Sequence, residues 1–254
     1  TTPLPKALIV SPRGTIRQDA NISLLADMSL DQITNLETDV ETNLDVSALV
    51  VDIGGVGMYP TMVMRSSNLP WVIQTIAHEW THNYLSLHPL GLNYDTSNDL
   101  RTMNETTAAI VGEEISLKVI ARYYPEYSAD TIPQKKVAKT KSARYEESFD
   151  FNAEMHITRV TADNLLKMGK ITEAEAYMEA RRQYFLQNGY LIRKLNQAYF
   201  AFYGAYADSP QGPAGADPVG PAVRAFRAQN STLKAFLRQI AWMSSLNQLQ
   251  SKVR

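Results

Sequence analysis

The chain has no cysteine and almost no excess of either charge, and both facts narrow what it can be. Without thiols, disulfide bridges and thiolate metal sites are excluded, so any metal must be held by histidine or oxygen ligands. The 25 Lys and Arg residues nearly balance the 26 Asp and Glu residues, which gives a net charge of −1. This balance provides no general attraction to nucleic acid or to an anionic membrane, and we expect no nucleic-acid partner.

Long apolar runs are also missing. No stretch reaches the roughly 20 apolar residues that a membrane-spanning helix needs, and no signal-peptide pattern is visible. The sequence begins Thr-Thr-Pro-Leu-Pro without a methionine, which we interpret as a processed or trimmed form. If a removed signal or anchor preceded Thr1, we expect an extracytoplasmic location; otherwise the sequence leaves the location open.

Hydrophobic patterning predicts a mainly helical α+β protein with a small N-terminal sheet. The apolar runs at 7–10 and 46–53 are expected to be strands. The segment 58–64 is expected to be another strand, and it should lie at a sheet edge because Pro60 cannot donate to a ladder. The segment Gly-Gly-Val-Gly at 54–57, just before it, permits either a turn or a close approach of the backbone to a neighbour.

The remainder of the chain has helical periodicity, with two capping-box patterns, Ser29 with Gln32 and Thr172 with Glu175. Helices are expected from Ser29 to about residue 44 and at about 69–87, 104–123, 142–168, 172–188, 190–207 and 218–247. The Gly/Pro-rich stretch at 211–221 is expected to be a loop, which overlaps the start of the last helix.

No internal repeat or linker divides the chain. We therefore expect a single domain over residues 1–254, with a sheet-containing part at about 1–125 and a helical part at about 126–254.

Histidine is scarce, yet two of the four histidines stand in the segment I-A-H-E-W-T-H-N-Y-L at 76–85. Residues four apart on a helix lie about 40° apart around its axis and about 6 Å apart along it, so His78 and His82 present two imidazoles to one point. A tetrahedral Zn²⁺ accepts this geometry. Glu79 is rotated by about 100° from His78, beside the metal, where it can take a proton from a water molecule.

Apolar residues surround this motif and support a buried helix, which would need partners for its polar side chains. They are Val72, Ile73, Ile76, Ala77, Trp80, Tyr84 and Leu87. The simpler alternative is that both histidines are hydrogen-bonded residues that hold no metal.

A zinc site of this kind needs one more protein ligand. Glu105 opens the next predicted helix, with 22 residues between it and His82, and a helix–loop–helix of that length can return antiparallel and point Glu105 at the metal. His88 is an alternative ligand, but Leu85 stands where the longer metalloprotease motif has glycine and Pro89 places His88 in a turn.

The segment H-E-W-T-H, followed by N-E-T-T-A at 104–108, resembles the gluzincins, the thermolysin-like and aminopeptidase-N-like zinc peptidases. The resemblance covers about residues 50–115. It implies a zinc-dependent peptidase acting on peptides or proteins, with one Zn²⁺ per chain held by His78, His82 and Glu105, Glu79 as general base, and an edge strand that binds extended substrate.

One departure from the gluzincin pattern concerns the support of the zinc histidines. Ala109 stands where thermolysin-like enzymes have an aspartate that steadies one of these histidines, so that support must come from elsewhere. Glu113 is a candidate for this role or for holding a substrate amine. Both Glu113 and Glu114 are otherwise expected on a solvated face.

Peptide hydrolysis also needs a hydrogen-bond donor for the oxyanion. Tyr199 and Tyr203 are the first candidates, since they share a stripe at helical spacing with Asn196 and Tyr206, and His156 is the next. The alternative is that the stripe is ordinary core with hydrogen-bonded hydroxyls and that His156 is structural.

The sequence thus leaves three hypotheses. The first is a zinc peptidase in which Glu79 moves the proton. The second is a catalytically inactive, zincin-like module that binds peptides, against which the retained Glu79 argues. The third is a helical interaction protein in which the motif is accidental.

Overall fold

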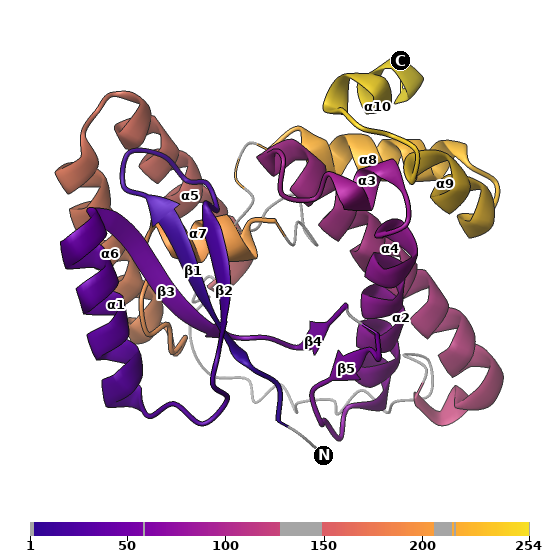
Figure 1. Cartoon of the computed structure of the whole chain (residues 1–254), viewed down its shortest axis with the longest axis horizontal. Helices are drawn as coiled ribbons and strands as arrows, with labels where there is room; N and C mark the ends of the chain where they lie inside the picture. The colour runs from indigo at the N-terminus through magenta and orange to yellow at the C-terminus, as the bar shows by residue number, and fades with distance from the viewer. Residues whose placement is uncertain (1–2, 58, 128–148, 206–214, 216, 254) are drawn as a thin grey trace, which may run out of the picture.

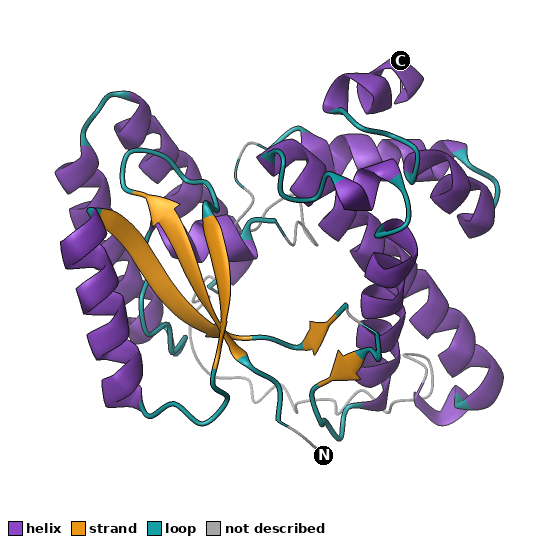
Figure 2. Cartoon of the chain, in the orientation of Figure 1, coloured by secondary structure: helices purple, strands orange, loops and turns teal. Residues whose placement is uncertain are grey.

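A computed structural model describes residues 3–57, 59–127, 149–205, 215 and 217–253. The protein is α+β and mainly helical, with a small sheet near its N-terminus and helices through its C-terminal half (Figures 1 and 2), which confirms the predicted fold class.

The sheet consists of β1 (Lys6–Pro12), β2 (Ala20–Leu24) and β3 (Val46–Asp52), which are antiparallel in the order β2-β1-β3. Side chains alternate between its two faces. Helix α1 (Leu30–Leu44) covers the face formed by Leu8, Val10, Ala48 and Val50. Helix α7 (Gln197–Tyr203) covers the opposite face, formed by Ala7, Ile9, Leu49 and Val51.

The strand expected at 58–64 is wrong in extent. The structure has a separate hairpin of two short strands, β4 (Gly55–Val56) and β5 (Met62–Val63), joined through Pro60. Part of the Gly-Gly-Val-Gly segment is therefore itself a strand. The hairpin lies beside helix α2 (Figure 1), to which Asn83 ties it through a 2.7 Å hydrogen bond to Thr61 Oγ1.

Two long helices, α2 (Leu69–Leu85) and α4 (Asn98–Tyr123), lie side by side and are joined by the short α3 (Pro89–Leu92). Helix α4 begins six residues earlier than expected because Ser97 caps it, accepting a hydrogen bond from the Leu100 amide. The short 3₁₀ turn Pro125–Tyr127 follows.

The helices of the second half fall into two groups. Helices α5 (Phe151–Lys167) and α6 (Ile171–Gln187) pack together on the sheet side of the molecule. Helices α8 (Val219–Gln229), α9 (Leu233–Ile240) and α10 (Leu246–Val253) share a core with α2, α3 and α4. Side-chain packing thus does not follow chain order.

Several predicted helix ends are wrong because capping residues were missed. Thr232 caps α9 and Ser245 bonds the Gln248 amide, so the expected helix 218–247 is broken into pieces. Asn196 caps α7, so the expected helix 190–207 is confined to Gln197–Tyr203 within the described residues.

Of the two predicted capping boxes, the structure contains one. The box at Ser29 and Gln32 is confirmed, since both of its hydrogen bonds are present. Helix α6 begins at Ile171, so Thr172 lies inside it and caps nothing. Residues 142–148 of another expected helix, and residues 211–214 and 216 of the expected loop at 211–221, lie outside the described residues.

The expectation that the motif helix is buried is wrong for part of its surface. Ile76, Trp80 and Leu87 are exposed on one side of α2 or just beyond its end. Helix α2 contacts α4 on one side and the β4–β5 hairpin on another, and these neighbours leave a third face open. Among the described helices, none has the length and apolar character needed to cross a membrane.

A buried ion pair fastens the sheet side. Glu37 of α1 is 2 % exposed, accepts two hydrogen bonds from Arg193 at 2.6 and 2.8 Å, and accepts a third from the Val50 amide at 2.6 Å. Burial favours the neutral acid, but Arg193 and the Val50 amide outweigh it and hold the pKa of Glu37 below its usual value. One carboxylate thus joins α1, β3 and the segment before α7.

We predict that Glu37→Ala lowers the free energy of unfolding by about 2–3 kcal/mol, because it leaves Arg193 and the Val50 amide without their partner. Chemical denaturation measures this. The control is Glu179→Ala, which removes an exposed i,i+3 pair with Arg182 and should cost no more than about 0.5 kcal/mol. Equal effects of the two substitutions would contradict the role given to Glu37.

Candidate metal centre

The two motif segments meet where α2 and α4 pack closely. Gly112 of α4 sits against α2: a Cβ at this position would stand 2.8 Å from the Gln74 carbonyl oxygen and 3.4 Å from His78 Cβ. Any larger residue would push the helices apart. Glycine at position 112 therefore allows Glu105, two turns earlier on α4, to reach the histidines of α2.

The side chains of His78, His82 and Glu105 converge on one point. The two Nε2 atoms are 3.0 Å apart, and Glu105 Oε2 lies 3.4 Å from His78 Nε2 and 3.5 Å from His82 Nε2. Nitrogen and oxygen ligands about 2.05 Å from a tetrahedral Zn²⁺ lie roughly 3.3 Å from one another. Within the described part of the chain, this is the one group of His, Asp or Glu side chains arranged to hold a metal ion.

Glu105 itself indicates that a cation belongs there. Its side chain is 3 % exposed, and its Oε2 atom is buried without a hydrogen-bond partner among the described residues. A buried carboxylate oxygen in this state is costly unless a cation, either a metal ion or a protonated imidazole, faces it. The three residues therefore fit a divalent ion with nitrogen and oxygen preference.

Asn104 supplies the support that Ala109 cannot. The Nδ1 atom of His82 donates to Asn104 Oδ1 at 2.8 Å, while the Asn104 amide nitrogen donates to the Leu90 carbonyl at 3.4 Å. The second bond fixes which end of the amide faces His82. The ring is therefore protonated on Nδ1, which leaves Nε2 as its metal-ligating atom.

Tyr94 and Arg101 support the third ligand. The Tyr94 hydroxyl donates a short hydrogen bond to Glu105 Oε1, so the two carboxylate oxygens have different tasks. Arg101, which is also buried, donates to the Tyr94 oxygen at 3.4 Å and to the Ala201 carbonyl at 3.0 Å. This series of contacts connects the metal ligand with α7 on the sheet side of the molecule.

Glu79 is held between α2 and the hairpin. It is 8 % exposed, and the backbone of Gly55 and Gly57 lies against it. A Cβ at Gly55 would stand 2.4 Å from Glu79 Oε1, and a Cβ at Gly57 would stand 2.6 Å from His82 Cβ. Of the two interpretations of Gly-Gly-Val-Gly, the structure supports close backbone approach.

The charges of the site shift one another's pKa values. Burial raises the pKa of Glu79, and the nearby histidines only partly offset this. Burial lowers the pKa of His82, but the carboxylates of Glu105 and Glu79 outweigh it and raise the value to about 9. Burial favours neutral Glu105, yet His82 and His78 hold its pKa well below the usual range.

The remaining candidates lie elsewhere. His88 is the residue just before α3, and its side chain makes no capping hydrogen bond to that helix. Instead its Nδ1 donates to the Tyr84 carbonyl, and its ring packs against Tyr84 and Trp242. Glu113 is exposed. Glu114 is not free in solvent as expected, since it forms a bidentate pair with Arg227.

The expected oxyanion donors are on the sheet side. Tyr199 and Tyr203 stack on each other on α7, 4.5 Å between ring centroids, and burial raises the pKa of both. His156 lies on α5, and its Nδ1 is buried without a hydrogen-bond partner among the described residues. Their role as donors stays a prediction, whereas the structure places the Tyr94 hydroxyl against Glu105.

Sequence reasoning missed Tyr94, Arg101 and the bond made by Asn104. Arg101 stands one helical turn before Glu105, a spacing that indicates two side chains on one face. Asn104 is part of the N-E-T-T-A segment itself. Tyr94 lies in the connection between helices, where the sequence carries no periodic signal.

Comparison of the chain with protein-family models, with curated proteins and with solved structures gives no match. The functional argument therefore depends on the geometry of the site.

We predict that the purified chain binds one zinc ion and that His82→Ala abolishes this binding, because only two ligands remain. Elemental analysis after dialysis measures the ratio. His88→Ala is the matched control and should keep the full ratio, since this ring belongs to the Tyr84–Trp242 cluster. A His82→Ala protein that retains an equivalent of zinc would exclude the site.

We predict that zinc affinity rises about tenfold per pH unit between pH 7 and 9 and levels off above about pH 9. The raised pKa of about 9 means that metal-free His82 carries an extra proton at pH 7, which the ion must displace from Nε2. Competition with a chelator, corrected for the chelator's own protonation, measures the slope. An affinity that is flat between pH 7 and 9 would show that no such proton is released.

Proposed function

We propose that the protein is a zinc-dependent peptidase. The observation that carries this proposal is the convergence of His78, His82 and Glu105 on one point, with the Glu79 carboxylate held beside them by Gly55 and Gly57. Three protein ligands leave one position of a tetrahedral ion for water or substrate, which is the arrangement of catalytic rather than structural zinc sites.

The donor set favours zinc over other abundant divalent ions. Two imidazoles and one carboxylate suit Zn²⁺, whereas Mg²⁺ and Ca²⁺ prefer sites built from oxygen. When bound, zinc would supply a Lewis acid that acidifies a water molecule and polarises a substrate carbonyl.

Glu79 has the properties of a general base in this setting. Burial raises its pKa above that of an exposed glutamate, which makes its carboxylate a stronger proton acceptor. The same carboxyl can then return that proton to the leaving amine. A site that only held a structural metal would have no need of this buried carboxylate.

The hairpin supports a peptide as substrate. Within the described residues, β4 and β5 form a sheet of two strands, so each strand has one edge that pairs with no other strand. An extended peptide can add to such an edge through main-chain hydrogen bonds. Because Gly55 and Gly57 lie against Glu79 and His82, a peptide along this hairpin would pass close to the catalytic groups.

We predict that Glu79→Gln keeps the fold and the zinc ion but lowers kcat on a peptide library at least about 10³-fold. Glutamine has nearly the same shape but cannot accept the proton. Glu113→Gln, the same change at an exposed position of α4, is the control and should leave turnover unchanged. Zinc-loaded wild-type protein that cleaves nothing in the library would instead favour the peptide-binding module.

The oxyanion donor can be found by removing single hydroxyl or imidazole groups. We predict that Tyr199→Phe, Tyr203→Phe or His156→Ala lowers kcat by about 10²–10³-fold with little change in KM or zinc content. If all three leave kcat within about tenfold of wild type, the C-terminal half is scaffold. A comparable loss in Tyr94→Phe at full zinc content would then assign the donor to Tyr94.

A further inference from the structure

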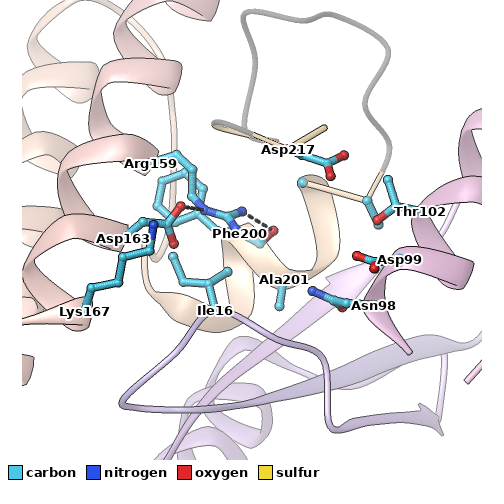
Figure 3. Close-up of a pocket in the computed structure, with 12 residues that line it drawn as sticks. Ile16, Asn98, Asp99, Thr102, Arg159, Asp163, Lys167, Phe200, Ala201 and Asp217 are labelled. Carbon is cyan, nitrogen blue, oxygen red and sulfur yellow. Dashed lines mark hydrogen bonds and ion pairs between the residues drawn. The ribbon is translucent and has the colours of Figure 1, made fainter. Parts of the chain in front are cut away.

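A second polar site lies beyond the metal centre. A cavity of about 210 Å³ opens between α4, α5, α7 and the start of α8 (Figure 3). Its lining is mostly polar and includes three carboxylates and two cations, Asp99, Asp163, Asp217, Arg159 and Lys167. The residues assigned to the metal centre are not among those that line it.

The charges are distributed unevenly within the cavity. Arg159 donates hydrogen bonds to Asp163 at 2.8 Å and to the Phe200 carbonyl at 3.4 Å. The charges of Arg159 and Asp163 therefore largely cancel. Figure 3 shows this pair and Lys167 on one side, with Asp217 and Asp99 toward the other. The acidic side therefore has two carboxylates that form no ion pair within the described residues, although Arg159 is near enough to attract Asp217.

The Asp217 carboxylate is held in place. Both of its oxygens accept backbone hydrogen bonds at the start of α8, from the amides of Val219 and Gly220. Burial raises the pKa of Asp217 and the neighbouring Asp99 carboxylate adds to the rise, while the two backbone hydrogen bonds and Arg159 only partly offset it. Two carboxylates that repel each other across a cavity would both be stabilised by a cation between them.

An independent observation comes from Thr102. Its side chain is only 8 % exposed, it lines the cavity, and it forms no hydrogen bond with any residue that the structure describes. The hydroxyl oxygen is not among the fully buried unpaired atoms, so it is open to the cavity, where a ligand or water can form a hydrogen bond with it. In Figure 3 Thr102 lies on the same side as Asp99 and Asp217.

The cavity is close to the metal ligand along α4. Asn98, Thr102 and Glu105 lie within about 60° of one another around the helix axis, and Thr102 is only about 4.5 Å from Glu105 along it. Ala201, whose carbonyl accepts from Arg101, lines the cavity as well. The cavity and the metal centre therefore share one face of α4.

We propose that this cavity binds a cationic group, the guanidinium or ammonium of a basic residue in the substrate, through Asp99, Asp217 and Thr102. If the protein is the peptidase proposed above, this binding would select peptides with a basic residue near the cleaved bond. That selection rests on the proposed function, whereas the binding of the cationic group does not. An organic cation fits better than a divalent metal ion, because the three carboxylates do not form a metal-binding group among the described residues.

The test is calorimetric binding of N-acetyl-arginine amide to the zinc-loaded chain, with N-acetyl-citrulline amide as the neutral probe of the same shape. We expect the arginine probe to bind at least about tenfold more tightly. Asp99→Asn should weaken it about fivefold or more, and the double variant Asp99→Asn/Asp217→Asn should abolish the preference. Asparagine at 217 can still accept one of the two backbone hydrogen bonds at the start of α8 through its single side-chain oxygen.

The control is Asp95→Asn, which removes the same charge from an exposed position outside the cavity lining and should leave binding unchanged. Equal affinity for both probes, or equal loss in Asp95→Asn and Asp99→Asn, overturns the proposal. If the protein cleaves peptides without preferring basic residues and binds both probes equally, the cavity proposal is wrong but the proposed peptidase function stands. Arginine binding without any cleavage supports the cavity while the peptidase fails.

Discussion

The carboxylate of Glu105 is the constraint on which the metal centre depends. It is buried, one of its oxygens lacks a hydrogen bond among the described residues, and two imidazoles face that oxygen. In the metal-free protein these groups stabilise one another by sharing protons, as the raised pKa of His82 and the lowered pKa of Glu105 show. A divalent ion would replace the protons and satisfy all three ligands together.

Much of the surrounding structure serves to keep those groups in place. Gly112 allows the two helices to approach, and Gly57 allows the hairpin to lie against His82. Asn104 fixes the orientation of the His82 ring, and Tyr94 holds the second oxygen of Glu105. These contacts come from four separate segments, so the site is rigid only when the helices, the hairpin and the connection before α4 are all assembled.

The convergence of Glu105 on the two motif histidines could be predicted from the sequence because it depends on helical spacing, which is local. His78 and His82 are one turn apart, and Glu105 lies on the next long helix. The same reasoning overestimated the burial of α2, because Ile76 and Trp80 have the composition of core residues but no neighbour covers them. Tyr94 could not be found, since its place beside Glu105 depends on how an irregular connection folds back.

Helix ends show the same division between local and tertiary information. The capping box at Ser29 was recognisable and correct, whereas the caps at Thr232 and Asn196 were overlooked inside longer apolar patterns. Ala109 cannot support a histidine, and the support expected from elsewhere comes from Asn104, one residue before Glu105. A missing motif residue therefore did not mean a missing interaction.

Zinc-dependent stabilisation of the folded chain tests the central claim most directly. Wild-type protein stripped of metal should gain about 2.7 kcal/mol in unfolding free energy when free zinc reaches about 100 times its dissociation constant. Glu105→Gln has nearly the same shape but lacks the charge, and at the same zinc concentration it should gain almost nothing. Equal stabilisation of the two proteins would mean that the ion binds without Glu105, and the metal centre described above would be wrong.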